Sequence, residues 1–377
     1  MTESTQTQPP QKQLVLLGAG NAHIHVLSTL AKQPVPGVQI TLIAPYPRQL
    51  YSGMVPGFVA GHYALEDCVI ELEPLLKNTR IRWLQHSVTA LDVNAATVTL
   101  DDGSEISFDW LSVNTGPVQD RQRLEQTLPG AREHGLFVRP IETFGALWPR
   151  VTELAKTRAL RIAVLGGGAA GVELAMAIQH RLPTSSVSLV TGGAAVAAHY
   201  IPTVQQRVTH ALKLRNITVL TDLAVGIQSD QVSLASGARL ACDVPVIATG
   251  GQAPAWLDGS GLALDEQGFI AVDACQRSTS HARVFAAGDV STRMDQLLAR
   301  SGVYAVRAGP ALSKNLLAVI AGIPPSPHMP PANSLNLLSC GNRFAIASWG
   351  RYSAEGRWVW RLKDWIDRSF IKRYRKA

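Results

Sequence analysis

Two glycine-rich turns of the same kind recur along this chain. The first reads Gly18-Ala-Gly20-Asn-Ala-His23, and the second reads Gly166-Gly-Gly168-Ala-Ala-Gly171. Each turn follows a short apolar strand and opens a helical segment, which is the arrangement that places a dinucleotide pyrophosphate at a helix N-terminus. Two such turns in one chain predict two dinucleotide sites, and a protein with two sites of this kind usually moves electrons between two cofactors.

The same order of elements surrounds both turns. The first series runs through a strand at 13–17, a helix at 22–32, a strand at 38–44, hairpin sequence within 81–112 and a strand ending in Thr115-Gly116. The second repeats it with a strand at 160–165, a helix at 169–181, a strand at 187–191, hairpin sequence within 217–241 and a strand ending in Thr249-Gly250. This repeat predicts an α/β protein with two Rossmann-like three-layer domains.

Composition and cysteine spacing narrow the class of protein. The 377 residues suffice for two domains, and 46% hydrophobic against 17% charged residues is typical of a globular chain. The polar start and the lack of a long apolar run predict a cytoplasmic protein without signal peptide or membrane span. The four cysteines form no CxxC pair, which argues against a redox disulfide and a zinc site, and His23, His25 and His62 fit no closed site, so we expect no metal.

Both turns depart from the usual dinucleotide pattern. Only the second has glycine at its third position; in the first, His23 there implies either a looser helix–strand contact or an imidazole near the phosphates. Neither unit has the acid that commonly binds ribose hydroxyls at the end of the second strand, where the sequence reads Ala44-Pro45 and Thr191-Gly192. No arginine follows the second of these strands before Arg207, so the sequence does not choose between NADH and NADPH.

A third motif, Gly288-Asp289, follows an apolar strand near the end of the repeat. Together with the two turns and the two Thr-Gly endings, it resembles the pyridine nucleotide–disulfide oxidoreductase superfamily over most of the chain. The stretches 14–25, 45–63, 301–310 and 358–368 are most similar to the type II NADH dehydrogenase-like group, and most of all to the flavoprotein module found fused to selenide, water dikinase.

The resemblance implies roles for named residues. FAD would contact Gly18, Gly20, Asn21, Ala22, His23, Tyr51, Ser52, Gly53, Thr115, Gly116, Gly288, Asp289, Val290, Tyr304 and Ala305. NAD(P)H would contact Gly166, Gly168, Ala169, Ala170, Gly171, Glu173, Thr249 and Gly250. Glu173 would lie near the nicotinamide as the one catalytic candidate, with a first-turn acid that complements the helix N-terminus as its alternative.

The resemblance also implies a division of the chain and an activity. We expect a disordered tail at 1–13, an FAD-binding domain at 14–140 and 255–322, an NAD(P)-binding domain at 141–254, and a Pro-rich connector with a basic aromatic unit at 323–377. The expected activity is transfer of a hydride from NAD(P)H to FAD and on to a quinone or another small acceptor. The alternatives are a flavoprotein acting on a sulfur or selenium compound and a flavin-bound interaction protein without turnover.

The basic charge is concentrated in the last segment. The net charge is +7, and residues 351–377 contain nine Lys or Arg and three acids. Trp358, Leu362, Trp365, Ile366, Phe370 and Tyr374 recur there at helical spacing. Such a helix can bind peripherally at a membrane surface, here the inner face of the cell membrane; the alternative is packing on the protein's own body. Nothing in the chain offers base recognition, so we expect no nucleic-acid partner.

Overall fold

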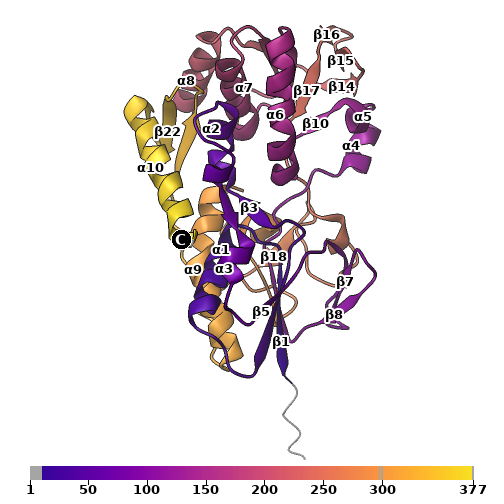
Figure 1. Cartoon of the computed structure of the whole chain (residues 1–377), viewed down its shortest axis with the longest axis vertical. Coiled ribbons are helices and arrows are strands. Elements are labelled where there is room, and N and C mark those ends of the chain that lie inside the picture. The colour runs from indigo at the N-terminus through magenta and orange to yellow at the C-terminus, as the bar shows by residue number, and fades with distance from the viewer. Residues whose placement is uncertain (1–10, 297, 299, 376–377) are drawn as a thin grey trace, which may run out of the picture.

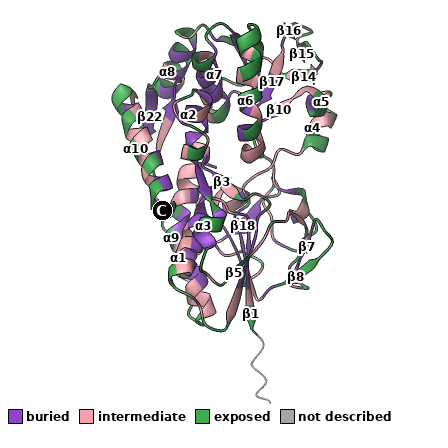
Figure 2. Cartoon of the chain, in the orientation of Figure 1, coloured by how far each residue is buried: buried purple, intermediate pink, exposed green. Residues whose placement is uncertain are grey.

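The chain forms two parallel sheets, one in each repeat unit, and a smaller third unit beside them. The computed structural model describes residues 11–296, 298 and 300–375. Each parallel sheet has five strands. In Figure 1 the first unit lies below the second, and the C-terminal helix runs along one side of both. Figure 2 shows that the central strands are buried, while exposed residues lie on the outer faces of the helices and on the hairpins.

The first unit is built on a sheet in the order β19-β9-β1-β2-β5. Leu14 and Leu16 point into a core shared with helices α1 and α9, whereas Val15 and Leu17 pack on the opposite face against the antiparallel sheet β6-β7-β8. The strands of these two sheets and the two helices are β1 (Lys12–Leu17), β2 (Val38–Ile43), β5 (Ile81–Leu84), β6 (Val88–Asp92), β7 (Thr97–Leu100), β8 (Glu105–Ser107), β9 (Trp110–Val113), β19 (Val284–Ala286), α1 (Asn21–Lys32) and α9 (Gly302–Ile320).

Shorter elements complete the first unit around the carboxyl edge of its sheet. They are β3 (Arg48–Leu50), β4 (Val69–Glu71), β18 (Ile270–Val272), β20 (Ser291–Arg293), α2 (Val55–Val59), α3 (Leu72–Leu76) and the 3₁₀ turns η1 (Ser52–Met54), η2 (Glu66–Cys68), η3 (Ala255–Leu257) and η4 (Gly288–Val290). The segment predicted as a loop or broken helix at 49–62 contains η1 and α2.

The second unit repeats this plan on a sheet in the order β10-β17-β11-β12-β13. Ile162 and Val164 face the core that contains α7, and Ala163 and Leu165 face the sheet β14-β15-β16. The elements are β10 (Leu136–Phe137), β11 (Arg161–Leu165), β12 (Ser186–Val190), β13 (Thr218–Leu220), β14 (Ala224–Ile227), β15 (Gln231–Leu234), β16 (Arg239–Ala241), β17 (Val244–Ile247), α4 (Arg121–Thr127), α5 (Ala131–His134), α6 (Ile141–Thr157), α7 (Ala169–Arg181) and α8 (Pro202–Lys213).

The register of the strands confirms the internal repeat. Leu17 pairs with Val113 in the first sheet, and Leu165 pairs with Ile247 in the second. Leu17 and Leu165 directly precede the two glycine turns. Val113 and Ile247 each lie two residues before the threonine of a Thr-Gly ending. Positions in the two units can therefore be matched one by one, and the predicted α/β architecture is confirmed.

The third unit covers the sides of α7 and α8. It consists of an antiparallel sheet of β21 (Leu335–Ser339), β22 (Ala345–Trp349) and β23 (Tyr352–Gly356), followed by α10 (Arg357–Tyr374). Val359 packs with Ala345 and Ala347 of this sheet, while Phe370 and Tyr374 join the central core. The α10 helix also contacts α1 and β4 of the first unit, and it runs along one side of the molecule (Figure 1).

Some predicted boundaries differ from the structure. Residues 12 and 13, expected in a disordered tail, pair with β2 as the start of β1; residues 1–10 lie outside the described residues. The segment 136–137 pairs with β17, so the second sheet draws on residues before the predicted boundary at 140. The residues 81–84 and 218–220 belong to the parallel sheets and not to hairpins, because each is the third strand beside β2 or β12.

Candidate functional site

The first glycine turn packs directly against the end of β9. Gly18 has φ +83, and a Cβ there would lie 2.7 Å from the Thr115 Cα. A side chain at Gly20 would meet the backbone and side chain of Asn114 in the same way. These two glycines therefore allow the turn to approach the neighbouring strand end, as the sequence predicts.

His23, at the third position of this turn, lies under the turn and not in the cavity beside it. The imidazole is fully buried; its Nδ1–H donates to the Gly18 carbonyl at 2.6 Å, and its Nε2 accepts from the Ser112 hydroxyl at 2.8 Å. Burial lowers its pKa to about 4, so the ring is neutral near pH 7. The expectation of an imidazole near the phosphates is wrong, because both ring nitrogens already have partners in the protein.

Asn114, which the sequence analysis missed, completes this network. Its Oδ1 accepts the N–H groups of Ala22 and His23 at 3.0 and 3.1 Å, and its Nδ2 donates to the Ala287 carbonyl at 2.5 Å. The amide thus caps α1 and ties it to the segment that contains Gly288-Asp289. Its place directly before Thr115-Gly116 is the signal that could have identified it.

A cavity of about 690 Å³ opens at this carboxyl edge. Its wall combines the first glycine turn, the Thr-Gly ending and the start of α9, which come from distant parts of the chain. Eight of the residues predicted to bind FAD line it, namely Gly18, Gly20, Asn21, Ser52, Thr115, Gly116, Asp289 and Ala305. The cavity has the size and position of a cofactor site at the strand ends of an α/β sheet.

The remaining predicted FAD residues lie elsewhere. Ala22 and Val290 are fully buried, and Gly288 and Tyr304 line a separate cavity of about 60 Å³ on the other side of Asp289. Tyr51 stacks on Phe370 of α10 with ring centroids 4.4 Å apart. The Gly53 carbonyl accepts a 2.7 Å hydrogen bond from Lys363 Nζ. The segment 51–53 therefore also connects the first unit to α10.

Charged side chains that the sequence analysis missed gather in the cavity wall. Arg48, Arg121, Arg139 and Glu142 line it together with Asp289. Burial lowers the pKa of Arg139, although the nearby charges of Asp289 and Glu142 act in the opposite direction. Burial also raises the pKa of Asp289, and there the charges of Arg139 and Arg300 oppose the shift. Arg139 supplies positive charge beside the first turn, and its position between the two sheets gave no motif to find.

An unpartnered acceptor also borders the cavity. Gln49 is buried and donates its Nε2–H to Asn21 Oδ1 at 2.7 Å, but its Oε1 has no partner among the described residues. A buried amide oxygen without a partner costs free energy unless a ligand or water supplies a donor. The flavin dinucleotide has hydroxyl and N–H donors, so this wall fits such a group.

The second glycine turn relies on close packing where the first uses hydrogen bonds. A Cβ at Gly171 would run into the Gly166 carbonyl, and Gly166 itself has φ +130 against Ala248. The space beside Ala169 and Ala170 remains open, because a Cβ at the neighbouring Gly168 or at Gly250 would meet nothing within 4 Å. The turn thus leaves room for a ligand at the N-terminus of α7, beside Thr249.

Glu173 faces the third unit. Its Oε1 accepts the Ser339 N–H at 2.7 Å. Burial raises its pKa to about 7, and Lys363 opposes this shift. Lys363 in turn is paired with Asp367 at 2.8 Å. The carboxyl group therefore titrates near neutrality at the junction of α7, β21 and α10.

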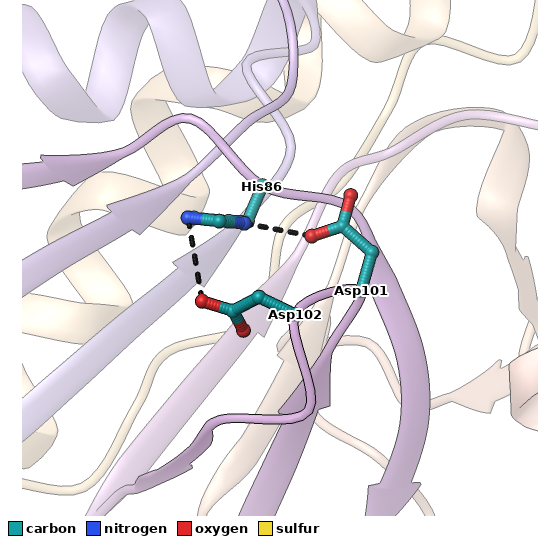
Figure 3. A group of neighbouring side chains, drawn as sticks. All are labelled: His86, Asp101 and Asp102. Carbon is teal, nitrogen blue, oxygen red and sulfur yellow. Dashed lines mark hydrogen bonds and ion pairs between the residues drawn. The ribbon is translucent and has the colours of Figure 1, made fainter.

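One exposed group of ionisable side chains lies at the rim of the large cavity. Figure 3 shows the His86 imidazole between Asp101 and Asp102, with its nitrogens 2.7 and 3.6 Å from the two carboxylates. His25 and His62 take other partners, Tyr374 and the Gly341 carbonyl. The Asp101 carboxylate accepts hydrogen bonds from His86 and from the Ser87 N–H, so these side chains form a local hydrogen-bonded network.

These features define an α/β protein of two Rossmann-like units, each with a glycine turn at the start of a helix. The family model for pyridine nucleotide-disulphide oxidoreductases matches residues 12–309, and the chain belongs to this family. It is an FAD-dependent NAD(P)H oxidoreductase. The resemblance to the dikinase-fused module stays a prediction.

Known proteins are similar to this chain over between two thirds and nearly all of its length. The oxidoreductase ptaL of Pestalotiopsis fici is 24% identical over 92% of this chain and 93% of its own. The demethylphylloquinone reductase NdbB of Synechocystis is 26% identical over 66% of this chain and 64% of its own. The structure of the sulfide:quinone oxidoreductase from Aquifex aeolicus superposes with a TM-score of 0.77 at 19% identity, over 97% of this chain and 91% of that one.

Proposed function

We propose that this protein passes a hydride from NAD(P)H, held at the second glycine turn, to FAD in the 690 Å³ cavity, and from there to a quinone or another small acceptor. The observation that carries the proposal is this cavity, which joins the first glycine turn, Thr115-Gly116 and Asp289. Bound FAD supplies the hydride-accepting and electron-donating chemistry.

The chain's own residues position the cofactor. Asn21, at the start of α1, would hold the pyrophosphate, and Arg139 would add positive charge beside it. Asp289 would accept hydrogen bonds from the hydroxyls of the chain that links the flavin ring to the pyrophosphate, and Thr115 with Gly116 forms part of the cavity wall. His23 and Asn114 act from below by fixing the turn. Holding two reactants in contact lowers the barrier by up to roughly 7–11 kcal/mol.

Glu173 is proposed to position the nicotinamide. It lies one turn into α7, and its pKa of about 7 allows either protonation state under working conditions. The bond from Ser339 and the charge of Lys363 orient the carboxyl group. A Glu173→Gln variant keeps the hydrogen-bonding shape, so a change in the pH profile of flavin reduction would separate a role in the reaction from a structural one.

Quinone is the preferred acceptor because two of the relatives carry that word in their names. The alternative sulfur or selenium chemistry would need a reactive group at the flavin. Cys68, Cys242 and Cys340 are buried, Cys275 lies away from the large cavity, and no cysteine lines it. The cavity therefore favours direct reduction of a small acceptor over transfer through a cysteine.

The visible spectrum under anaerobic conditions tests the proposal. The purified protein should show a flavin spectrum that bleaches on addition of NADH or NADPH and returns when a soluble quinone is added. A flavin spectrum that neither nucleotide bleaches would overturn the hydride transfer. Bleaching that a quinone does not reverse would overturn the choice of acceptor alone.

The outer face of α10 is proposed as the contact with a membrane surface. No helix among the described residues is long and apolar enough to cross a bilayer. The predicted aromatic face is divided: Phe370 and Tyr374 pack inside, whereas Trp358 and Trp365 are 58% and 67% exposed. Arg361, Arg368 and Lys372 are exposed and recur at helical spacing on the same side, which suits an anionic interface.

Vesicle binding by point variants tests this surface. Replacing both Trp358 and Trp365 by Ala should weaken co-sedimentation with anionic vesicles by about tenfold or more, because exposed apolar area is lost. Leu154→Ala, which trims an exposed apolar residue on α6, is the matched control and should bind like the wild type. Equal binding of all three proteins would contradict the proposal.

A further inference from the structure

The strands β2 and β12 both end without an acidic residue. In each unit the chain of the neighbouring strand, β5 or β13, continues beside that end. The Ala44 N–H donates to the Leu84 carbonyl at 3.1 Å, and the Thr191 N–H donates to the Leu220 carbonyl at 3.0 Å. Two residues beyond these carbonyls lie His86 and Asp222. The two side chains therefore occupy matching positions in the repeat.

The small hairpins confirm this match. The Asp101 N–H donates to the Ser87 carbonyl at 3.0 Å, and the Ala235 N–H donates to the Leu223 carbonyl at 2.8 Å. Both carbonyls belong to the residue that follows the matched position. Each hairpin then turns through a glycine of positive φ, at 103 in the first unit and 237 in the second.

The hairpin in each unit orients the matched side chain. In the first, His86 is held between Asp101 and Asp102 (Figure 3). In the second, Asp222 Oδ2 accepts from the Ser236 hydroxyl at 2.5 Å, and Oδ1 accepts the Leu223 N–H at 2.7 Å. The first unit thus has a base held by acids, and the second has an acid held by a hydroxyl.

The matched position borders the ligand space. His86 lines the 690 Å³ cavity of the first unit. Asp222 borders the corresponding space of the second unit, because its own carbonyl accepts the Gly192 N–H at 2.8 Å beside the end of β12. This is the strand end at which an acid normally binds the adenosine ribose of NADH.

We infer that Asp222 supplies from the third strand the acid that β12 lacks, and that it selects NADH over NADPH. A carboxylate accepts hydrogen bonds from ribose hydroxyls, and it repels a 2′-phosphate. Residues 182–206 contain no Lys or Arg that would neutralise such a phosphate. The inference rests on the proposed nucleotide site at the second glycine turn.

The carboxylate is charged and held in place for this role. Hydrogen bonds from Ser236 and from the Leu223 N–H lower the pKa of Asp222. Each carboxylate oxygen has a further lone pair after these bonds, so both can still accept from a ribose. The side chain therefore needs no rearrangement to receive a ligand.

Calorimetric titration with fragments of the two coenzymes tests the inference. ADP-ribose and 2′-phospho-ADP-ribose differ only at the site in question, and neither requires flavin turnover. The wild-type holoenzyme should bind ADP-ribose at least about tenfold more tightly, the value of one or two charge-assisted hydrogen bonds. Asp222→Asn should abolish most of this preference.

Two further variants separate charge from structure. Asp230→Asn, at an exposed acid directly before β15, is the matched control and should keep the wild-type ratio. Ser236→Ala leaves the Asp222 charge in place, so it should weaken ADP-ribose binding modestly while 2′-phospho-ADP-ribose stays excluded. Thermal melts by circular dichroism establish that all variants are folded.

The outcomes distinguish this inference from the proposed function. If NADH bleaches the flavin but Asp222→Asn keeps the wild-type fragment ratio, the assignment of Asp222 is overturned and the oxidoreductase remains. Preference of the wild type for 2′-phospho-ADP-ribose would also overturn it. If neither fragment binds and neither coenzyme bleaches the flavin, the proposed nucleotide site itself is wrong.

Discussion

The two glycine turns occupy matching positions in the repeat, but different contacts hold them in place. In the first, His23, Ser112 and Asn114 form a buried hydrogen-bonded network under the turn. The matching positions of the second turn are Gly171, Val246 and Ala248, as the strand register shows. Three polar residues in one unit therefore correspond to three small or apolar residues in the other.

This difference changes what each helix start offers a ligand. In α1, Asn114 occupies the N–H groups of Ala22 and His23, so the turn is fixed from within the protein. No side chain among the described residues caps α7, and a Cβ at its N-cap residue Gly168 would meet nothing within 4 Å. The start of α7 therefore leaves its first N–H groups available to a ligand, whereas two of those in α1 are already bound.

Removing the cap should give the largest effect. Asn114→Ala leaves two buried N–H groups and the Ala287 carbonyl without partners, which should lower the free energy of unfolding by about 3–5 kcal/mol. Urea unfolding of the flavin-free protein measures this loss, and Asn94→Ala, on the exposed β6–β7 turn, is the control. One ordinary hydrogen bond contributes about 1 kcal/mol. If Asn114→Ala lowers the free energy of unfolding by less than about 1 kcal/mol more than the control variant does, Asn114 does not act as a cap.

The pH dependence of stability should separate the two turns next. Because burial lowers the pKa of His23 from 6.5 to about 4, the unfolded chain binds a proton below pH 6.5 that the folded chain does not. Stability linked to His23 is therefore complete above pH 6.5 and falls by about 3 kcal/mol as the pH drops to about 4.

A glutamine at this position removes the titration and keeps polar atoms. The free energy of unfolding of the wild type should fall more steeply than that of His23→Gln between pH 6.5 and 4. The two curves should run parallel outside this range. Curves that stay parallel throughout would show that His23 is not held neutral in the folded protein.

The same contrast shows how far the sequence could lead. The strand–turn–helix order and the repeat were predicted because apolar periodicity and glycine spacing are local signals, whereas the role of Asp289 came from the family resemblance and stays a prediction. Asn114, Arg139 and the orientation of His23 were not, since each depends on which strand lies beside the turn. The α6 and α8 helices were also missed, because no motif marks the segment before β11 or the connection between β12 and β13.

Alanine at Gly168 should give the smallest change in stability and a direct test of where the ligand lies. Gly168 has φ −75, and a Cβ there meets nothing within 4 Å, so Gly168→Ala should alter stability by no more than about 0.5 kcal/mol. The added methyl group would stand in the open cradle, and the affinity for ADP-ribose should fall by about tenfold or more. Gly171→Ala is the matched variant: its Cβ strikes the Gly166 carbonyl and should cost about 1–3 kcal/mol of stability. If Gly168→Ala binds ADP-ribose like the wild type, the open space above α7 is not where the pyrophosphate lies.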